Sequence, residues 1–171
     1  IDGVKEIEVQ TMVQAVIQEV LEEGKPMETF PRGIEDGALK ELKKYVAEGS
    51  LDDAKLKDGK GIILNSEGFL LSQSGKGFHI GDKVHLDIKD GEDSVSREFE
   101  IVAITKHAPY PLAGYDICMP SSVPQEFSKN NLTDRYNITA EKGKAAEVTK
   151  AVKALAENQE FLDIETYQEV Y

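Results

Sequence analysis

The stretch Val84-His85-Leu86-Asp87-Ile88-Lys89-Asp90-Gly91, followed by residues 96–104, carries the clearest structural signal in this sequence. Its apolar residues alternate with polar ones, which is the period of a β-strand with one buried face. Asp90-Gly91 is a favoured hairpin turn, and a second apolar run follows it. We therefore predict an antiparallel hairpin that buries Val84, Leu86 and Ile88 on one face.

Other segments predict further strands and helices around this hairpin. An amphipathic helix is expected over about 36–48 with Gly49 as its C-terminal cap, and Ser66 can cap a helical turn that ends near Gly75. The end of the chain reads as strand, helix and strand, which together with the β-rich middle predicts an α+β fold. The remaining predicted strands cover 4–9, 61–64, 115–119, 135–139 and 161–164. Of the remaining helices, a short one opens at Ser121/Ser122 and runs toward Phe127, and the other covers 144–157.

Residues 11–30 allow two interpretations. The apolar residues Met12, Val13, Val16, Ile17, Val20 and Leu21 recur at helical spacing, so periodicity alone favours a helix. Many of them are β-branched, which favours a strand. A hairpin is equally natural if residues 22–25 form the turn and a second strand covers 26–30. The pattern by itself leaves both open.

Composition excludes several classes of protein. The chain has 171 residues, which is about one domain, and 40% of them are hydrophobic, enough to exclude disorder. It carries 20 basic and 32 acidic residues, a net charge of −12, so we expect no nucleic-acid partner. No run approaches the roughly 20 apolar residues of a membrane-spanning helix. Because the sequence opens Ile1-Asp2-Gly3 without an initiator Met or a signal peptide, we expect a fragment of a longer protein.

No catalytic, cofactor-binding or metal-binding residue is predicted. The only histidines, His79, His85 and His107, lack ligand spacing, and no serine stands in a nucleophile motif. The single cysteine, Cys118, cannot form an internal disulfide and reads as a small buried hydrophobe. The remaining candidates have simpler explanations as turns, solvated loops or chance matches: residues 75–81 as a phosphate loop, Asp52/Asp53 and Glu92/Asp93 as calcium ligands, and Asn131 and Asn137 as glycosylation acceptors.

The order of the segments resembles the large extracytoplasmic domain of MacB/FtsX-like ABC transporter permeases. The resemblance spans nearly all of the chain and is most evident in the motifs Gly-Asp-x-Val-x-Leu at 81–86 and Phe-x-Ile-Val-x-Ile at 99–104. Family domains usually have a helical segment before the Gly-Val opening, and that segment is missing here. In chain order the matching pieces are Gly3-Val4, Gly33-Ile34-Glu35, a helix ending in Gly49, Gly61-Ile62-Ile63-Leu64-Asn65-Ser66, residues 80–86, residues 99–104, Met119-Pro120 and a terminal β-α-β.

This resemblance implies a two-lobed α+β fold. A porter-like β-α-β lobe would come from both chain ends, residues 1–45 and 133–171, with a small β-rich lobe inserted at 46–132. It also implies that residues 11–30 form a hairpin rather than a helix.

The function that the resemblance implies is mechanical and not enzymatic. The domain would lie on the extracytoplasmic side of a cell membrane and relay a cytoplasmic ATP cycle to the export of peptides, lipoproteins or drugs, or to a partner protein. Its partners would be the membrane helices of the parent permease, a separate ATPase subunit or domain, and an extracytoplasmic adaptor or peptide cargo. No cofactor is expected. The alternative is an extracytoplasmic sensor or peptide-binding module, for which the net charge of −12 would suit a cationic peptide.

Overall fold

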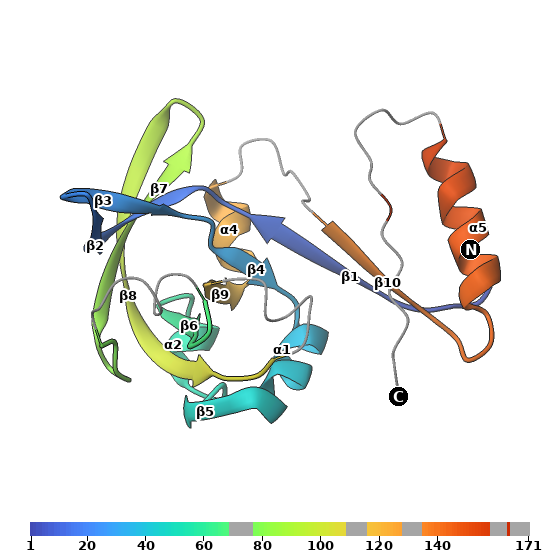
Figure 1. Cartoon of the computed structure of the whole chain (residues 1–171), viewed down its shortest axis with the longest axis horizontal. Coiled ribbons are helices and arrows are strands. Elements are labelled where there is room, and N and C mark those ends of the chain that lie inside the picture. The colour runs from blue at the N-terminus through green and yellow to red at the C-terminus, as the bar shows by residue number, and fades with distance from the viewer. Residues whose placement is uncertain (69–76, 109–115, 128–134, 158–163, 165–171) are drawn as a thin grey trace. The chain divides into compact units, whose positions relative to one another are not determined.

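A computed structural model describes residues 1–68, 77–108, 116–127, 135–157 and 164 (Figure 1). The chain divides into two compact units, a larger one of Glu8–Arg135 and a smaller one of Ile1–Ile7 with Tyr136–Tyr171. The lobe boundaries given by the sequence analysis remain a prediction.

The larger unit is built on a mixed sheet. Its β4–β9 and β6–β8 pairs are parallel, and the other strand pairs described within it are antiparallel. With its few helices, the unit confirms the predicted α+β class. A further strand, β5 (Val46–Gly49), pairs with β8. The sheet order is β1 (Val4–Met12), β4 (Arg32–Ile34), β9 (Ile117–Pro120), β6 (Gly61–Asn65), β8 (Asp93–Thr105), β7 (Lys83–Asp90), β2 (Ala15–Glu22) and β3 (Lys25–Thr29).

Strand β6 is buried on both faces, which explains its uninterrupted apolar sequence. Ile62 and Leu64 belong to one hydrophobic cluster, whereas Ile63 belongs to the other. Helix α4 (Ser122–Phe127) contributes to the first cluster, and α1 (Asp36–Leu42) and α2 (Ala54–Lys57) contribute to the second, as the placement of these helices in Figure 1 illustrates. A parallel strand covered on both sides does not show alternating polarity.

The predicted hairpin at 84–104 is confirmed. Strands β7 and β8 pair antiparallel from Lys83↔Glu100 to Asp90↔Asp93, so Gly91-Glu92 forms the two-residue loop. Gly91 has φ +71, a conformation that glycine adopts without strain. The predicted inward residues are fully buried: Val84, Leu86 and Ile88 are each 0% exposed.

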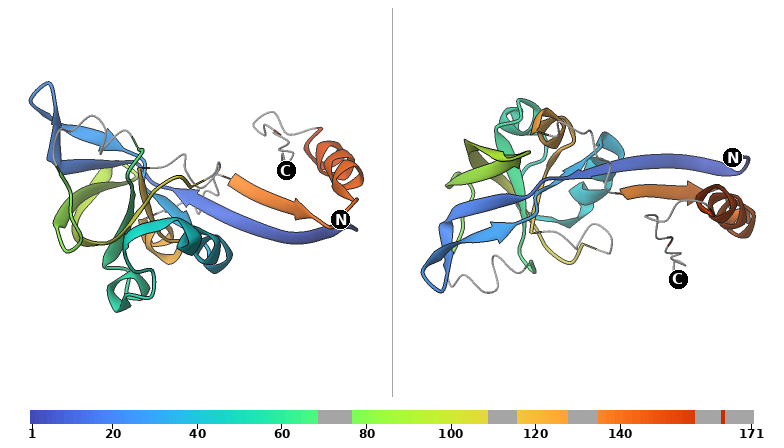
Figure 2. Two further views of the ribbon diagram at one scale, coloured as in Figure 1. Left: turned by 60° about the horizontal axis from the view of Figure 1, so that its bottom comes forward. Right: turned by 90° about the horizontal axis from the view of Figure 1, so that it is seen from above.

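Residues 15–29 form a second hairpin, so the helix that periodicity favoured is wrong and the resemblance was the better guide. The loop between β2 and β3 is Glu23-Gly24, with φ values of 52° and 79°, which matches a type I′ turn. Figure 2 shows this hairpin at the end of the larger unit's sheet. Three residues of β2, between Ile17 and Leu21, have no counterpart in β3.

The helix expected over 36–48 is shorter than predicted. Helix α1 ends at Leu42, a 3-10 turn covers Lys43–Tyr45, and the next residues form β5. Gly49 is therefore not a helix cap. It has φ +78, and a Cβ there would overlap the carbonyl oxygen of Val102, so its role is to let β5 approach β8 closely.

The other predicted elements agree with the structure where it describes them. Strands β1, β6, β9 and β10 (Arg135–Ala140) and helices α4 and α5 (Ala145–Ala156) lie at the predicted places. The end of the helical turn toward Gly75, Tyr115 at the start of a predicted strand, and residues 161–163 of the last predicted strand lie outside the described residues. Ile164, the last residue of that predicted strand, is described and does not lie in a strand.

The smaller unit pairs the beginning of β1 with β10 and adds α5. Gly3 has φ +82, and a Cβ there would press on the side chain of Lys144, which precedes the helix. The amide of Glu141 donates to the Gly3 carbonyl oxygen at 2.8 Å. Val148 is the buried residue of α5, at 4% exposure.

Candidate functional site

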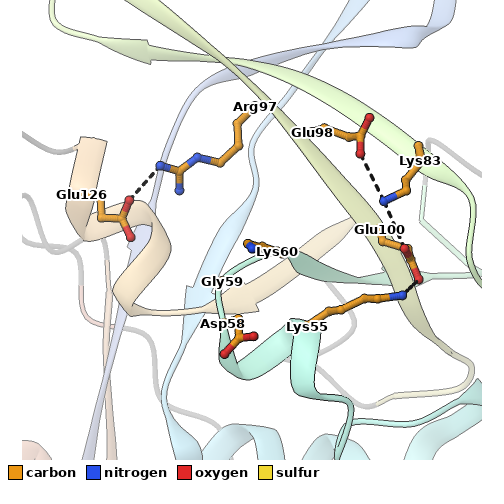
Figure 3. Close-up of a pocket in the computed structure, with 9 residues that line it drawn as sticks. All are labelled: Lys55, Asp58, Gly59, Lys60, Lys83, Arg97, Glu98, Glu100 and Glu126. Carbon is orange, nitrogen blue, oxygen red and sulfur yellow. Dashed lines mark hydrogen bonds and ion pairs between the residues drawn. The ribbon is translucent and has the colours of Figure 1, made fainter.

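A charged groove in the larger unit is the candidate site (Figure 3). Its volume is about 480 Å³, and α2, the turn before β6, β7, β8 and α4 contribute to it. Four cationic and four acidic side chains line it, although the whole chain is strongly acidic. The lining residues are Lys55, Asp58, Gly59, Lys60, Lys83, Arg97, Glu98, Glu100 and Glu126.

The register of the β7–β8 hairpin sets the charge pairs on one side of the groove. Lys83 stands opposite Glu100, and its Nζ lies 3.1 Å from Glu100 and 3.1 Å from Glu98. Lys55 on α2 forms an ion pair with the other carboxylate oxygen of Glu100. Glu100 is therefore shared by two lysines that come from different elements.

These contacts fix the charge states. Hydrogen bonds from Lys55 and then Lys83 lower the pKa of the Glu100 carboxyl. Hydrogen bonds to Glu100 and Glu98 raise the pKa of Lys83. Because opposite charges favour the ionised forms on both sides, this cluster stays charged across the neutral pH range.

Arg97 connects β8 with α4 on the other side of the groove. Its Nη2 lies 2.9 Å from Glu126, and its guanidinium lies 4.6 Å from the ring centre of Phe127. A planar guanidinium suits this combination of ion pair and cation–π contact. Figure 3 shows the arginine reaching from the strand toward the helix.

Two charges of the groove are not committed to an ion pair within the described residues. The turn from α2 into β6 carries both, Asp58 and Lys60, on either side of Gly59, whose φ is +69. Both are exposed. Figure 3 places Lys60 between the Arg97 pair and the Glu100 cluster, without a dashed contact.

The charge network continues beyond the groove to strand β2. His85 Nε2 lies 3.3 Å from Glu98, and its Nδ1 lies 2.6 Å from Glu19. The hydrogen bond to Glu19 is the main cause that raises the pKa of His85, and Glu98 adds to it. Acidic and basic groups thus alternate from Glu19 through His85, Glu98, Lys83 and Glu100 to Lys55.

The three histidines all pair with carboxylates. His79 lies 3.7 Å from Asp82, and His107 lies 2.7 Å from Glu67. Within the described ranges, no group of three or more His, Cys, Asp or Glu side chains is placed to hold a metal ion. The expectation that no residue is catalytic, metal-binding or cofactor-binding remains a prediction.

Cys118 is buried as predicted. It is 5% exposed in the core cluster beneath α1 and α2, and burial raises the pKa of its thiol to about 12. A thiol so held stays protonated near neutral pH.

The acidic pairs have structural roles. Asp52 pairs with Lys43 at 2.5 Å, and Asp53 caps α2 by accepting from the Lys55 amide at 2.8 Å. Glu92 and Asp93 belong to the β7–β8 turn. Asn137 lies in β10, while Asn131 and residues 75–76 lie outside the described residues.

The groove was not predicted from the sequence. The sequence feature that indicates the groove is the polar face of the predicted hairpin. This face carries Lys83 and His85 on one strand and Glu98 and Glu100 on the other. Once the register is known, opposite charges face each other. The contributions of α2 and α4 depend on tertiary packing and left no pattern along the chain.

Comparison with known proteins identifies the fold. No family model matches the sequence, and no curated protein matches it. Among the described residues, no helix combines the length and apolar character needed to cross a membrane.

Two solved structures are similar over 92% of this chain. One is the extracellular domain of the noncanonic ABC-type transporter YknZ from Gram-positive bacteria, with a TM-score of 0.58, 18% identity and 77% of its own chain covered. Another is the periplasmic region of MacB from Actinobacillus actinomycetemcomitans, with a TM-score of 0.54, 11% identity and 70% covered. The chain therefore has the fold of the extracellular and periplasmic domains of these ABC-type transporters, as the resemblance in the sequence predicted.

Proposed function

We propose that this chain is the non-enzymatic extracytoplasmic domain of an ABC transporter permease. The observation that carries the proposal is the likeness to the YknZ and MacB domains, which extends over 92% of the chain. Both neighbours are transporter domains rather than enzymes. In the charged groove, six of the eight acids and bases are held in ion pairs, as expected of groups that hold α2 and α4 against the sheet.

In this role the domain is anchored by membrane helices of the parent permease and works with a separate ATPase subunit or domain. It relays the ATP cycle to the far side of the membrane, where peptides, lipoproteins or drugs are exported or a partner such as an adaptor is engaged. The two-lobed arrangement, with a porter-like lobe of 1–45 and 133–171 and an insert at 46–132, belongs to the same proposal.

A helix variant tests the relay. Ala151 lies in the middle of α5, and Ala151→Pro removes a backbone donor and clashes with the preceding turn, which costs about 3 kcal/mol. In a full-length permease that carries this domain, we expect the variant to reach the membrane and to retain basal ATP hydrolysis but to lose export. Lys153→Ala, on the exposed side of the same helix, is the matched control and should export normally. Normal export by Ala151→Pro, with helix loss verified by circular dichroism, would contradict the relay.

The second candidate is an extracytoplasmic sensor or peptide-binding module. The net charge of −12 supports it, because an acidic surface steers cationic peptides toward itself. The two candidates differ in one measurement: a sensor binds its peptide with the same affinity whether or not the ATPase turns over, whereas a relay changes affinity or partner with the ATP cycle.

A further inference from the structure

Among the residues that the structure describes, strand β8 has an open backbone edge where it borders the charged groove. On one side β7 pairs with it from Asp93 to Glu100, but on the other side β6 pairs with it only from Glu100 onward. The Glu100 amide donates to the carbonyl oxygen of Lys60 at 2.9 Å. Successive amides of a strand point to opposite sides, so the amides of Glu98 and Ser96 point to the same side as the Glu100 amide. At their positions β6 has not yet begun.

This edge is accessible. The side chains of Ser94, Ser96 and Glu98 are all exposed. In the part of the chain that the structure describes, no strand pairs with residues 94–98 on this side. An unpaired edge of this kind is a template for an added strand, a common mode of peptide recognition.

The groove lies along this edge and supplies side-chain contacts on both faces of β8. Glu98 and Glu100 line it from one face, and Arg97 lines it from the other, next to α4 (Figure 3). Lys60 lies at the end of the open edge, because its carbonyl oxygen already accepts the hydrogen bond of the Glu100 amide. An added strand must therefore stop at Lys60.

The charge of Lys60 decides which end of a peptide stops there. A strand that runs antiparallel to β8 would begin at Lys60 and bring its terminal ammonium group against the lysine. A strand that runs parallel to β8, as β6 does, would end there with its terminal carboxylate. Attraction between the carboxylate and the uncommitted ammonium favours the parallel arrangement.

We propose that the charged groove binds the carboxyl-terminal end of an extended peptide, which adds a parallel strand to residues 94–98 of β8 and places its carboxylate at Lys60. The backbone pairing gives affinity with little sequence preference, and Arg97 and Glu98 contact side chains on the two faces of the added strand. This inference does not depend on the permease role, because it rests only on the edge of β8 and the turn before β6.

A pool of random hexapeptides provides the probe. The pool is prepared with free carboxyl ends and again with amidated ends, both acetylated at the amino end, and is titrated into the 171-residue chain while backbone amide shifts are followed by NMR. We expect the free-acid pool to shift the amides of Ser96, Glu98 and Lys60, with an apparent Kd about tenfold or more tighter than that of the amidated pool. The absence of shifts, equal shifts with both pools, or shifts confined to another surface would each overturn the proposal.

Two variants separate the carboxylate contact from the backbone contact. Lys60→Gln should abolish the preference for the free acid, whereas Lys57→Gln, an exposed lysine on α2 outside the groove lining, should keep it. Ser96→Pro removes an amide that points away from β7, so the hairpin ladder stays intact while the added strand loses a partner. If Ser96→Pro fails to fold, Lys60→Gln still decides, because a free-acid preference that survives in it contradicts the proposal.

Discussion

The carboxylate of Glu19 holds His85 at two points: it accepts from the backbone amide of His85 at 2.9 Å and lies 2.6 Å from the ring Nδ1. The two residues belong to neighbouring strands at the place where their ladder stops, since β2 and β7 pair only as far as Ile17↔Leu86. The next outward amide of β7 is that of His85, and a side chain takes the place of the missing backbone partner. Glu19 thus satisfies a donor that the irregularity in β2 would otherwise leave unpaired.

The same two-point arrangement recurs at His107, whose amide and Nδ1 both contact Glu67, at 3.0 and 2.7 Å. His85 differs because its Nε2 also faces a carboxylate, that of Glu98. Both ring nitrogens can donate to these carboxylates only when the ring is protonated. The contacts that His85 on β7 makes with β2 and with β8 are therefore linked to the protonation of its ring.

We predict that His85 stabilises the fold more in mild acid than in base. Its pKa in the folded chain is raised above the ordinary 6.5 by Glu19, so its contribution is fully present below 6.5 and is lost as the pH rises through the folded value. Urea unfolding of wild type and His85→Gln measures this directly. The substitution should lower the free energy of unfolding more at about pH 5.5 than at about pH 9. Ser94→Ala, at an exposed position of β8 that carries no titratable group, is the control and should not reproduce the trend. If His85→Gln lowers the free energy of unfolding equally at both pH values, the link between stability and His85 protonation is contradicted.

Gly49 and Gly24 form a matched pair for a test of close packing. Their φ values are 78° and 79°, but a Cβ at Gly24 meets nothing within 4 Å, whereas one at Gly49 overlaps the carbonyl oxygen of Val102. Gly24→Ala should cost about 1 kcal/mol from backbone strain alone. Gly49→Ala should cost at least about 2 kcal/mol more, because β5 must move away from β8. Similar unfolding free energies for the two variants would show that the fold does not depend on the close contact between β5 and β8 at Gly49.

Cys118 should be unreactive in the folded chain. Its thiol is buried, and a pKa of about 12 leaves almost no thiolate at pH 8. An alkylating reagent should therefore modify the native chain only as fast as the core opens, and the rate should rise with urea concentration along with unfolding. Stoichiometric labelling within minutes in buffer without denaturant would show that the core cluster beneath α1 and α2 is open.

Much of the fold was predictable because its local signals agree with its tertiary contacts. The β7–β8 hairpin combines alternation with a turn sequence, and the all-apolar β6 has the composition of a strand buried on both faces. The segment order also pointed to the transporter-domain fold. The end of α1 was misjudged because Val46 continues a helical stripe, although it lies in β5 and packs against the second core cluster.

The charged groove could be predicted only in part. Cross-strand partners such as Lys83 and Glu100 follow from the hairpin register, which the sequence indicates. Lys55, Lys60 and Glu126 reach the groove through α2, the turn before β6 and α4, which are brought together by packing over long sequence separations. No spacing along the chain records that proximity.

The misleading helical period in β2 gives the last prediction. Buried positions in this strand are Ala15, Ile17 and Val20, a spacing of two and then three. The face of the strand reverses because the three residues after Ile17 have no register partner in β3. A helix would bury Val20 and Leu21 together, but in the hairpin Val20 is 3% exposed and Leu21 is 60% exposed. Val20→Ala should therefore lower the unfolding free energy by about 2 kcal/mol, from lost burial plus a cavity, whereas Leu21→Ala should change it by less than about 0.5 kcal/mol. Urea denaturation of the two variants measures both values, and comparable losses would mean that Leu21 is buried in solution and that β2 does not have this irregular register.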